Sequence, residues 1–168
     1  MVLEDCDIIS PEFGWSVKNI EMKNCTAQSE YFMMRSENLR FSQVTFQGKY
    51  SFQYIENAVF ENCTFDTKDA FWHGKNVTVK DSTIKGEYLA WYSDGLTLIN
   101  CKIIGTQPFC YCKNLRLINC QMIDTDLAFE KSEHIYVPAA GELIFDDEQA
   151  KGQVIIQEKE APKRCACA

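Results

Sequence analysis

The sequence predicts an all-β protein, a single-stranded right-handed parallel β-helix of about seven rungs, where a rung is one turn of the coil. Two observations carry this prediction. The chain matches itself with a 19-residue period and no gap, and each copy alternates apolar and polar residues as a strand does, with no stretch of helical periodicity. The right hand is expected because crossover connections between parallel strands strongly prefer it.

Each copy of the repeat contains two short strand patterns. Two apolar positions two apart, such as Leu39 and Phe41, precede a polar step and a second pair, such as Val44 and Phe46. The polar step suits a corner, because Asn, Asp and Gln side chains bond locally and Asn and Asp tolerate left-handed backbone. The six complete copies start at Asn19, Asn38, Asn57, Asn76, Gly95 and Asn114.

A third element in each copy is short, apolar and aromatic, as in Ala70-Phe-Trp-His73. We interpret it as a third short strand, so that three strands and three corners complete a rung. Equivalent residues of neighbouring rungs then stack about 4.8 Å apart in columns.

The 19-residue spacing also accounts for most of the nine cysteines. Cysteine behaves in a core as a small hydrophobic residue, and five of the nine fall in one inward column. Cys110-Tyr-Cys112 lacks the second pair of ligands that a zinc site needs, so no metal and no cofactor is predicted. The column holds Cys6, Cys25, Cys63, Cys101 and Cys120, interrupted by Val44 and Ser82.

Charge and hydropathy restrict the partners. A net charge of −7 and a pI near 4.9 argue against nucleic-acid binding, which needs an excess of Lys and Arg. The sequence has no apolar run near the ~18 residues that would span a membrane. An acidic N-terminus unlike a signal peptide predicts a cytoplasmic protein with reduced thiols.

The repeat divides the chain into three parts. We expect β-helix repeats over residues 1–132, C-terminal strands that cap or flank the coil over 133–157, and a disordered tail over 158–168. Residues 132–137 resemble a seventh copy with slipped register. The chain opens inside a copy, so we expect either a piece of a longer coil or self-association through the uncapped N-terminal rung.

The segments Asn76–Ile84, Asp69–Trp72 and Gly86–Trp91 resemble an uncharacterised bacterial family of right-handed β-helix proteins with pectin-lyase-like repeats, classed as a domain of unknown function. The resemblance covers roughly residues 1–132, and 141–147 are similar to the closing segment of that family. It implies a pectin-lyase-like fold. It implies no activity and no catalytic residue.

Aromatic residues of the third element are the strongest functional hint. Either Phe71 and its equivalents face the core and Trp72 faces solvent, or the reverse holds, and the sequence leaves both open. The aromatic column is then either structural stacking or a surface for sugar rings or a protein partner. The candidate binding residues are Tyr54, Trp72, His73, Tyr88, Trp91 and Tyr92.

Two function classes follow. The first is a non-catalytic scaffold or binding module for a carbohydrate or protein ligand. The alternative is a carbohydrate-active enzyme, a polysaccharide lyase or glycoside hydrolase, because Glu37 and Glu56 fall about 5 Å apart, near the separation of a retaining carboxylate pair. Asp69 and His73 are a second weak pair of candidates, since no serine, cysteine or second histidine lies next to His73 in its column. No catalytic residue is therefore assigned.

Overall fold

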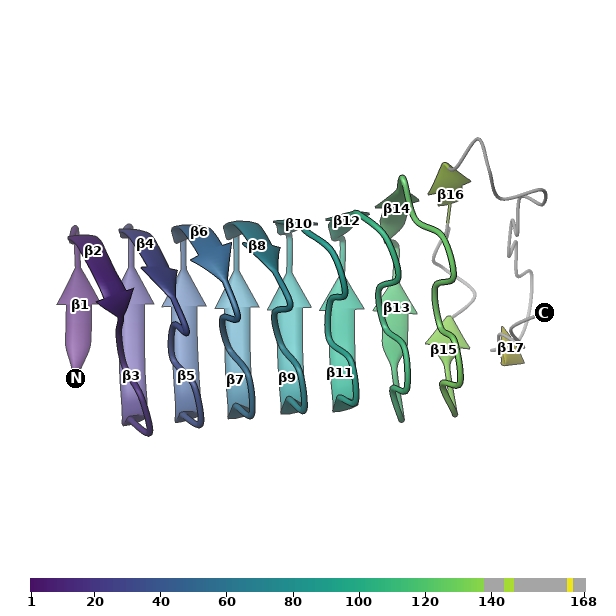
Figure 1. Ribbon diagram of the computed structural model, residues 1–168, viewed down its shortest axis with the longest axis horizontal. Helices are drawn as coiled ribbons and strands as arrows, with labels where there is room; N and C mark the ends of the chain where they lie inside the picture. The colour runs from purple at the N-terminus through teal and green to yellow at the C-terminus, as the bar shows by residue number, and fades with distance from the viewer. Residues whose placement is uncertain (138–143, 147–162, 165–168) are drawn as a thin grey trace.

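The computed structural model describes residues 1–137, 144–146 and 163–164. Over these residues the chain winds as a parallel β-solenoid, and successive turns add strands to two sheets that run side by side along the coil (Figure 1). The all-β solenoid prediction is confirmed. The described part of the chain contains no helix that could cross a membrane.

The first sheet has nine strands, each hydrogen-bonded to the equivalent strand of the next turn. All its pairings are parallel except the last, in which β17 runs antiparallel to β15. Its strands are β1 (Val2–Glu4), β3 (Lys18–Lys23), β5 (Glu37–Ser42), β7 (Glu56–Glu61), β9 (Lys75–Lys80), β11 (Asp94–Ile99), β13 (Arg116–Ile118), β15 (Tyr136–Val137) and β17 (Lys163–Arg164).

The second sheet has eight parallel strands, which alternate with those of the first along the chain. These strands are β2 (Asp7–Glu12), β4 (Thr26–Glu30), β6 (Thr45–Lys49), β8 (Thr64–Lys68), β10 (Thr83–Lys85), β12 (Lys102–Ile104), β14 (Gln121–Ile123) and β16 (Ile144–Asp146).

The register confirms the 19-residue repeat. Equivalent core positions of the first sheet are paired from strand to strand at this constant spacing. Six such steps join them, which gives about six regular turns where the sequence predicts about seven. The positions are Leu3, Met22, Phe41, Phe60, Val79, Leu98 and Leu117.

The register slips beyond β14, as the sequence predicts for residues 132–137. Arg116 pairs with Tyr136, where an unbroken repeat would place Ile135. The extra residue lies near Thr125. The N–H of Tyr88 bonds the Thr106 carbonyl, whereas that of the equivalent Gln107 bonds Asp126 instead of Thr125. Thr125 is buried there, and its hydroxyl oxygen has no hydrogen-bond partner within the part of the chain that the structure describes.

Glycine keeps the two preceding corners short. A Cβ at Gly105 would lie 2.0 Å from the carbonyl oxygen of Gly86, and a Cβ at Gly86 would lie 1.7 Å from that of Thr67. Both glycines have positive φ, 157° and 130° for Gly86 and Gly105. Only glycine permits so close a backbone approach. The chain gains its extra residue at the next corner, where Asp124 and Thr125 follow Ile123.

The predicted third strand is wrong. In the described turns the third side of the rung contains bends and turns, and every second residue has left-handed backbone, for example Phe52 with φ 56° and Tyr54 with φ 58°. Bonds between rungs still form, but they alternate in direction: the N–H of Phe52 reaches back to Phe32 and that of Tyr54 forward to Trp72. In an extended strand the N–H groups of residues two apart point to the same neighbour, so this pattern excludes a regular strand.

The core is a stack of phenylalanine rings between the three sides. Phe52 is fully buried, and its ring contacts those of Phe60 at 5.1 Å and Phe71 at 5.0 Å. The strands present alternate residues to this core, since Ala27 and Ser29 of β4 are buried and their neighbours are exposed. These contacts between rungs hold the coil together.

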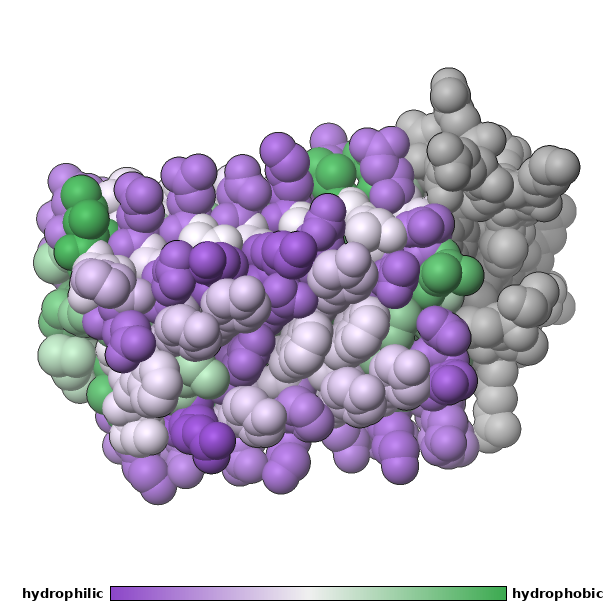
Figure 2. Space-filling model, viewed as in Figure 1, coloured by the Kyte–Doolittle hydropathy of each residue, from purple (hydrophilic) through white to green (hydrophobic). Residues whose placement is uncertain are grey.

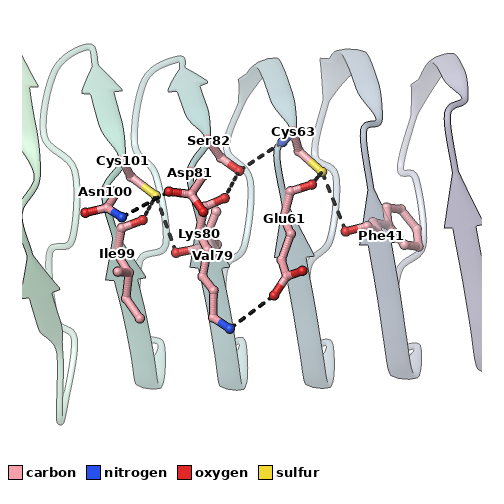
Figure 3. A network of polar contacts seen from close by, with 10 residues as sticks. All are labelled: Phe41, Glu61, Cys63, Val79, Lys80, Asp81, Ser82, Ile99, Asn100 and Cys101. Atoms are coloured by element: carbon pink, nitrogen blue, oxygen red, sulfur yellow. Dashed lines mark hydrogen bonds and ion pairs between the residues drawn. The ribbon is translucent and has the colours of Figure 1, made fainter.

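The cysteine column lines one inner corner (Figure 3). Each buried thiol of the column bonds two backbone carbonyl groups, as Cys101 does with Ile99 at 3.3 Å and Val79 at 3.4 Å. Ser82 replaces cysteine in this column and bonds the Lys80 carbonyl in the same way. Cysteine therefore serves as a small residue that is apolar and also caps the corner, and all seven cysteines in the described residues are free thiols.

Asparagine lines the polar outside of the corners, as predicted. Asn24, Asn62 and Asn100 have φ of 51°, 53° and 53°, in the left-handed region. A second asparagine column joins neighbouring rungs through hydrogen bonds between side-chain amides. The Asn38 amide donates to Asn19 at 2.9 Å, and the Asn76 amide donates to Asn57 at 2.7 Å.

Candidate functional site

The third side of the coil, which we name the turn face, carries most of the exposed aromatic residues. It faces the reader in Figures 1 and 2, where side chains of intermediate hydropathy gather between hydrophilic edges. Three columns run along it from rung to rung above two buried columns. The turn face comprises residues 31–35, 50–54, 69–73, 88–92 and 107–111.

One of these buried columns settles which aromatic residues face the core. Phe71 and Phe109 are 2% and 1% exposed, and Ala90 between them is 1% exposed. Trp72 and Trp91 therefore lie on the outer side, half-buried, with their rings stacked 5.3 Å apart at an angle of 5°.

These tryptophans serve the solenoid itself. The indole N–H of Trp72 donates to the Tyr88 carbonyl at 2.6 Å, and that of Trp91 donates to the Gln107 carbonyl at 2.8 Å. Gln53, one rung earlier, bonds the Asp69 carbonyl in the same way at 2.7 Å. Each side-chain N–H group of this column donates to a backbone carbonyl of the next rung, so the column joins consecutive turns.

The second column is an unbroken stack, which we name the outer stack. Tyr54, His73, Tyr92 and Tyr111 lie ring on ring, with centroids 4.7, 5.0 and 4.7 Å apart. A cation covers each end: the Arg35 guanidinium lies 5.0 Å from the Tyr54 centroid and the Lys131 ammonium 5.4 Å from that of Tyr111.

The orientation of the outer stack decides what it presents to solvent. Neighbouring rings are within 13° of parallel, so their faces cover one another and their edges point outward. Tyr54 and Tyr92 are 42% and 45% exposed, and their hydroxyl groups bond nothing among the described residues. Burial lowers the pKa of His73, which favours a neutral imidazole in the stack.

The third column, which we name the broken column, loses its aromatic ring at one rung. Tyr31 and Tyr50 stack at 5.0 Å, Asp69 follows at the equivalent position, and Tyr88 comes next. The sequence prediction included Tyr88 but missed Tyr31 and Tyr50. Their 19-residue spacing was the signal that could have found them.

Asp69 is the most unusual polar residue of this face. It is 7% exposed, and its carboxylate makes no hydrogen bond or ion pair within the described residues. Burial raises the pKa of this carboxyl, with a smaller opposing effect from Lys68 and a reinforcing one from Glu87.

The structure brings one of the two predicted catalytic pairs together and leaves the other apart. Glu37 and Glu56 are paired in register. Each forms an ion pair with a lysine on its other side, Glu37 with Lys18 at 3.0 Å and Glu56 with Lys75 at 3.2 Å, and all four side chains are solvent-exposed.

Asp69 and His73 occupy different columns of one rung and make no contact with each other. Within the described residues no three His, Cys, Asp or Glu side chains come together as metal ligands. Two of the buried thiols are poorly ionised, because burial raises the pKa of Cys63 to about 11 and that of Cys112 to about 12.

A shallow groove of about 550 Å³ lies on the outer surface of the nine-stranded sheet. The amide column of Asn19, Asn38, Asn57 and Asn76 lines it together with Arg40. These amides form hydrogen bonds with one another between rungs, so they stabilise the solenoid as well as lining the groove.

The fold and the turn face together define a β-solenoid protein with an aromatic stack along one side. The chain belongs to the family described as "Protein of unknown function (DUF3737)", whose model matches residues 1–160. This match confirms the predicted resemblance to an uncharacterised solenoid family. No curated protein matches the chain.

Two solved structures of trypsin-treated variants of QnrB1, described as a plasmid-mediated fluoroquinolone resistance protein, are similar in part. The first is 11% identical with a TM-score of 0.42, and the match covers 79% of this chain and 71% of that one. The second is 10% identical with a TM-score of 0.23, covering 82% and 92%.

Proposed function

We propose that the protein is a non-catalytic binding module whose interaction surface is the turn face. The observation that carries this proposal is the outer stack, in which Tyr54 and Tyr92 hold exposed hydroxyl groups without hydrogen-bond partners among the described residues. Stacking fixes the rings before any ligand arrives, so binding costs little side-chain entropy. The hydroxyl groups of Tyr54 and Tyr92 lie two rungs, about 10 Å, apart, and that of Tyr111 follows one rung, about 5 Å, further on.

The ligand is a polar carbohydrate or protein surface that lies along the outer stack. A sugar ring cannot stack flat on the outer stack, because neighbouring rings already cover the faces. Trp72 and Trp91 are also unsuited as a sugar platform, since their rings stack on each other and their N–H groups bond backbone. We therefore assign recognition to the hydroxyl edges of the tyrosines.

The finer fold type is part of this proposal. We infer a right-handed coil of the pectin-lyase-like type, supported by the general preference for right-handed crossovers and by the resemblance of the repeats. Fold type carries no activity with it. The ion pairs of Glu37 and Glu56 with lysines weigh against the enzyme alternative.

The experiment compares ligand arrays for the wild type and matched variants. Glycan and peptide arrays identify ligands of the wild type. The double substitution Tyr54→Phe/Tyr92→Phe removes two hydroxyl groups and keeps the stack, so it should weaken binding at least about tenfold, as expected for two lost hydrogen bonds of about 1 kcal/mol each. The control Thr78→Val/Thr97→Val removes two stacked hydroxyl groups from the nine-stranded sheet and should leave binding unchanged.

Two outcomes would overturn the proposal. One is a ligand whose affinity the tyrosine substitutions do not change. The other is depolymerisation of a polysaccharide, with or without calcium, that is lost in Glu37→Gln/Glu56→Gln, because this would establish the enzyme alternative.

We further propose self-association through the first rung. β1 and β2 each have a hydrogen-bonded neighbour on one side only. Val2 and Ile9 beside this edge are 65% and 84% exposed. An open strand edge flanked by apolar side chains favours pairing with a second copy. Sedimentation at micromolar concentration should show dimers, and a stable monomer would refute the idea.

A further inference from the structure

On one rung of the turn face, one column has a ring between two tyrosines and another column has an aspartate instead; we name the place of this missing ring the gap. In the outer stack, His73 lies between Tyr54 and Tyr92, 4.7 and 5.0 Å from their centroids. In the broken column of the same rung, Asp69 stands where a ring would be, and no ring contact joins Tyr50 to Tyr88. Two rungs separate these tyrosines by about 10 Å, the span that one flat group occupies in the outer stack.

The floor of this gap is a carboxylate without a hydrogen-bond partner among the described residues. Asp69 is 7% exposed, and its main chain is fixed because its N–H bonds the Glu87 carbonyl and its own carbonyl accepts from Gln53. Its oxygens still reach solvent, because among the described residues only the Thr125 hydroxyl is a fully buried side-chain polar atom without a partner. The partial loss of water around an unpaired carboxylate is nevertheless unfavourable. A positively charged group that supplies N–H donors would remove that cost.

A neighbouring lysine shows that a cation is tolerated at this place. The Lys68 ammonium lies 5.3 Å from the Tyr88 centroid and is held 3.0 Å from Glu87, without bonding Asp69. Its side chain is 49% exposed, so it can move aside for a guest at the cost of a surface ion pair. Such pairs contribute at most about 1 kcal/mol.

We propose that the gap between Tyr50 and Tyr88 is a binding site for a guanidinium group, held by Asp69. A guanidinium is planar, stacks on aromatic faces and donates two parallel N–H bonds to one carboxylate. An ammonium fits less well because it is not flat. A hard divalent cation needs about six oxygen ligands, and the described residues offer no cluster of three acidic or other metal-binding side chains.

This inference rests on the proposed binding function and specifies one ligand group for the same face. The guanidinium could belong to an arginine side chain of a protein partner or to free arginine. The chemistry at Asp69 is the same for both, and the affinities of a peptide and of the single amino acid distinguish them.

The test is a titration followed by backbone amide NMR signals. The probes are N-acetyl-arginine amide, free arginine, N-acetyl-lysine amide and N-acetyl-citrulline amide, which has the shape of arginine without the charge. An arginine-rich peptide from a library is the fifth probe. Arginine compounds should shift the signals of Gln53, Asp69 and Tyr88, whereas citrulline and lysine should shift them at least tenfold less at equal concentration.

Two variants make the result decisive. Asp69→Asn removes the charge and should abolish the shifts. Asp69→Tyr fills the gap with the residue that Tyr31, Tyr50 and Tyr88 place in the same column, so the fold is retained and arginine is excluded. Arginine binding that survives in Asp69→Tyr, equal binding of citrulline, or no shift with any arginine probe would overturn the inference.

The array ligands separate this inference from the proposed function. Ligands that depend on the hydroxyl groups of Tyr54 and Tyr92 should still bind Asp69→Tyr. If they do while arginine fails to bind the wild type, the guanidinium site is wrong and the binding module stands. If no array ligand depends on the tyrosine edges, the binding module itself is wrong.

Discussion

The outer stack and the broken column differ most sharply on one rung, where one has His73 and the other Asp69. Both columns have left-handed backbone and a 19-residue spacing, and both rest on the same buried phenylalanines. The outer stack continues through His73, whereas the broken column stops at Asp69. A single change of residue in a column therefore alters the surface of one rung while the neighbouring rungs keep their stacked rings.

The largest expected effect is a loss of stability that tests whether both columns depend on the buried phenylalanine core. Phe52→Ala removes a fully buried ring that contacts the rings of Phe41, Phe60 and Phe71. We expect the free energy of unfolding to fall by about 3–5 kcal/mol. Urea denaturation measures this, and a loss below about 1 kcal/mol would mean that the columns do not depend on the phenylalanine core.

Trp72 provides the next largest effect. Trp72→Ala loses the stack on Trp91 and leaves the Tyr88 carbonyl without its indole donor. These losses together should cost about 2 kcal/mol of stability. Trp72→Phe retains a ring but no donor and should cost about half as much. Equal stability of both variants and the wild type would show that Trp72 does not fasten the rungs.

Completing the broken column should stabilise the protein. Asp69→Tyr adds ring contacts to Tyr50 and Tyr88 and removes a buried carboxylate, for a gain of about 1 kcal/mol. Thermal unfolding of Asp69→Tyr is compared with that of Asp69→Ala, which removes the charge without adding a ring. If the tyrosine variant is no more stable than the alanine variant, the gap does not have the width of a ring.

The smallest effects are the pH dependences of the two columns. The raised pKa of Asp69 means that its stabilising contribution is fully present below the usual 3.8 and is lost as pH rises through the higher folded value. The stability of the wild type relative to Asp69→Asn should therefore decrease with rising pH above 3.8. A difference that stays constant or increases with pH would contradict the burial of the carboxylate.

His73 should show the opposite trend. Burial lowers its pKa, so its contribution is fully present above the ordinary value of 6.5 and is lost as pH falls through the lower folded value. His73→Phe keeps the stack and should be less sensitive to acid over that range. Urea midpoints measured from pH 7.5 to pH 5 compare the two proteins, and parallel curves would refute the prediction.

Sequence periodicity could assign residues to columns but could not orient the third side. The strand positions of Leu39 and Phe41 follow from period two, and the corners at Asn24 and Asn62 follow from the backbone tolerance of asparagine. The run Phe71-Trp72-His73 is aromatic throughout, so hydropathy does not distinguish its buried member. The prediction of a third strand was wrong because it assumed extended backbone. Phenylalanine and tyrosine residues with left-handed backbone are rare unless neighbouring rungs stabilise that conformation.

The domain boundaries remain predictions. Most of the predicted C-terminal strands over 133–157 and of the tail over 158–168 lie outside the described residues. Within that part, Tyr136–Val137 and Ile144–Asp146 continue the two sheets, and Lys163–Arg164 form β17.

The sequence by itself determined the repeat length, the spacing between equivalent positions and the membership of each column, including the cysteine corner. These follow from local backbone geometry, which repeats whenever the pattern repeats. Only the tertiary structure decided that Phe71 faces the core, that the tyrosines present edges and that Asp69 lies without a hydrogen-bond partner between Tyr50 and Tyr88 within the described residues. The reason is that hydrogen bonds between rungs impose the alternating left-handed backbone of the turn face, and such bonds exist only once the coil has formed.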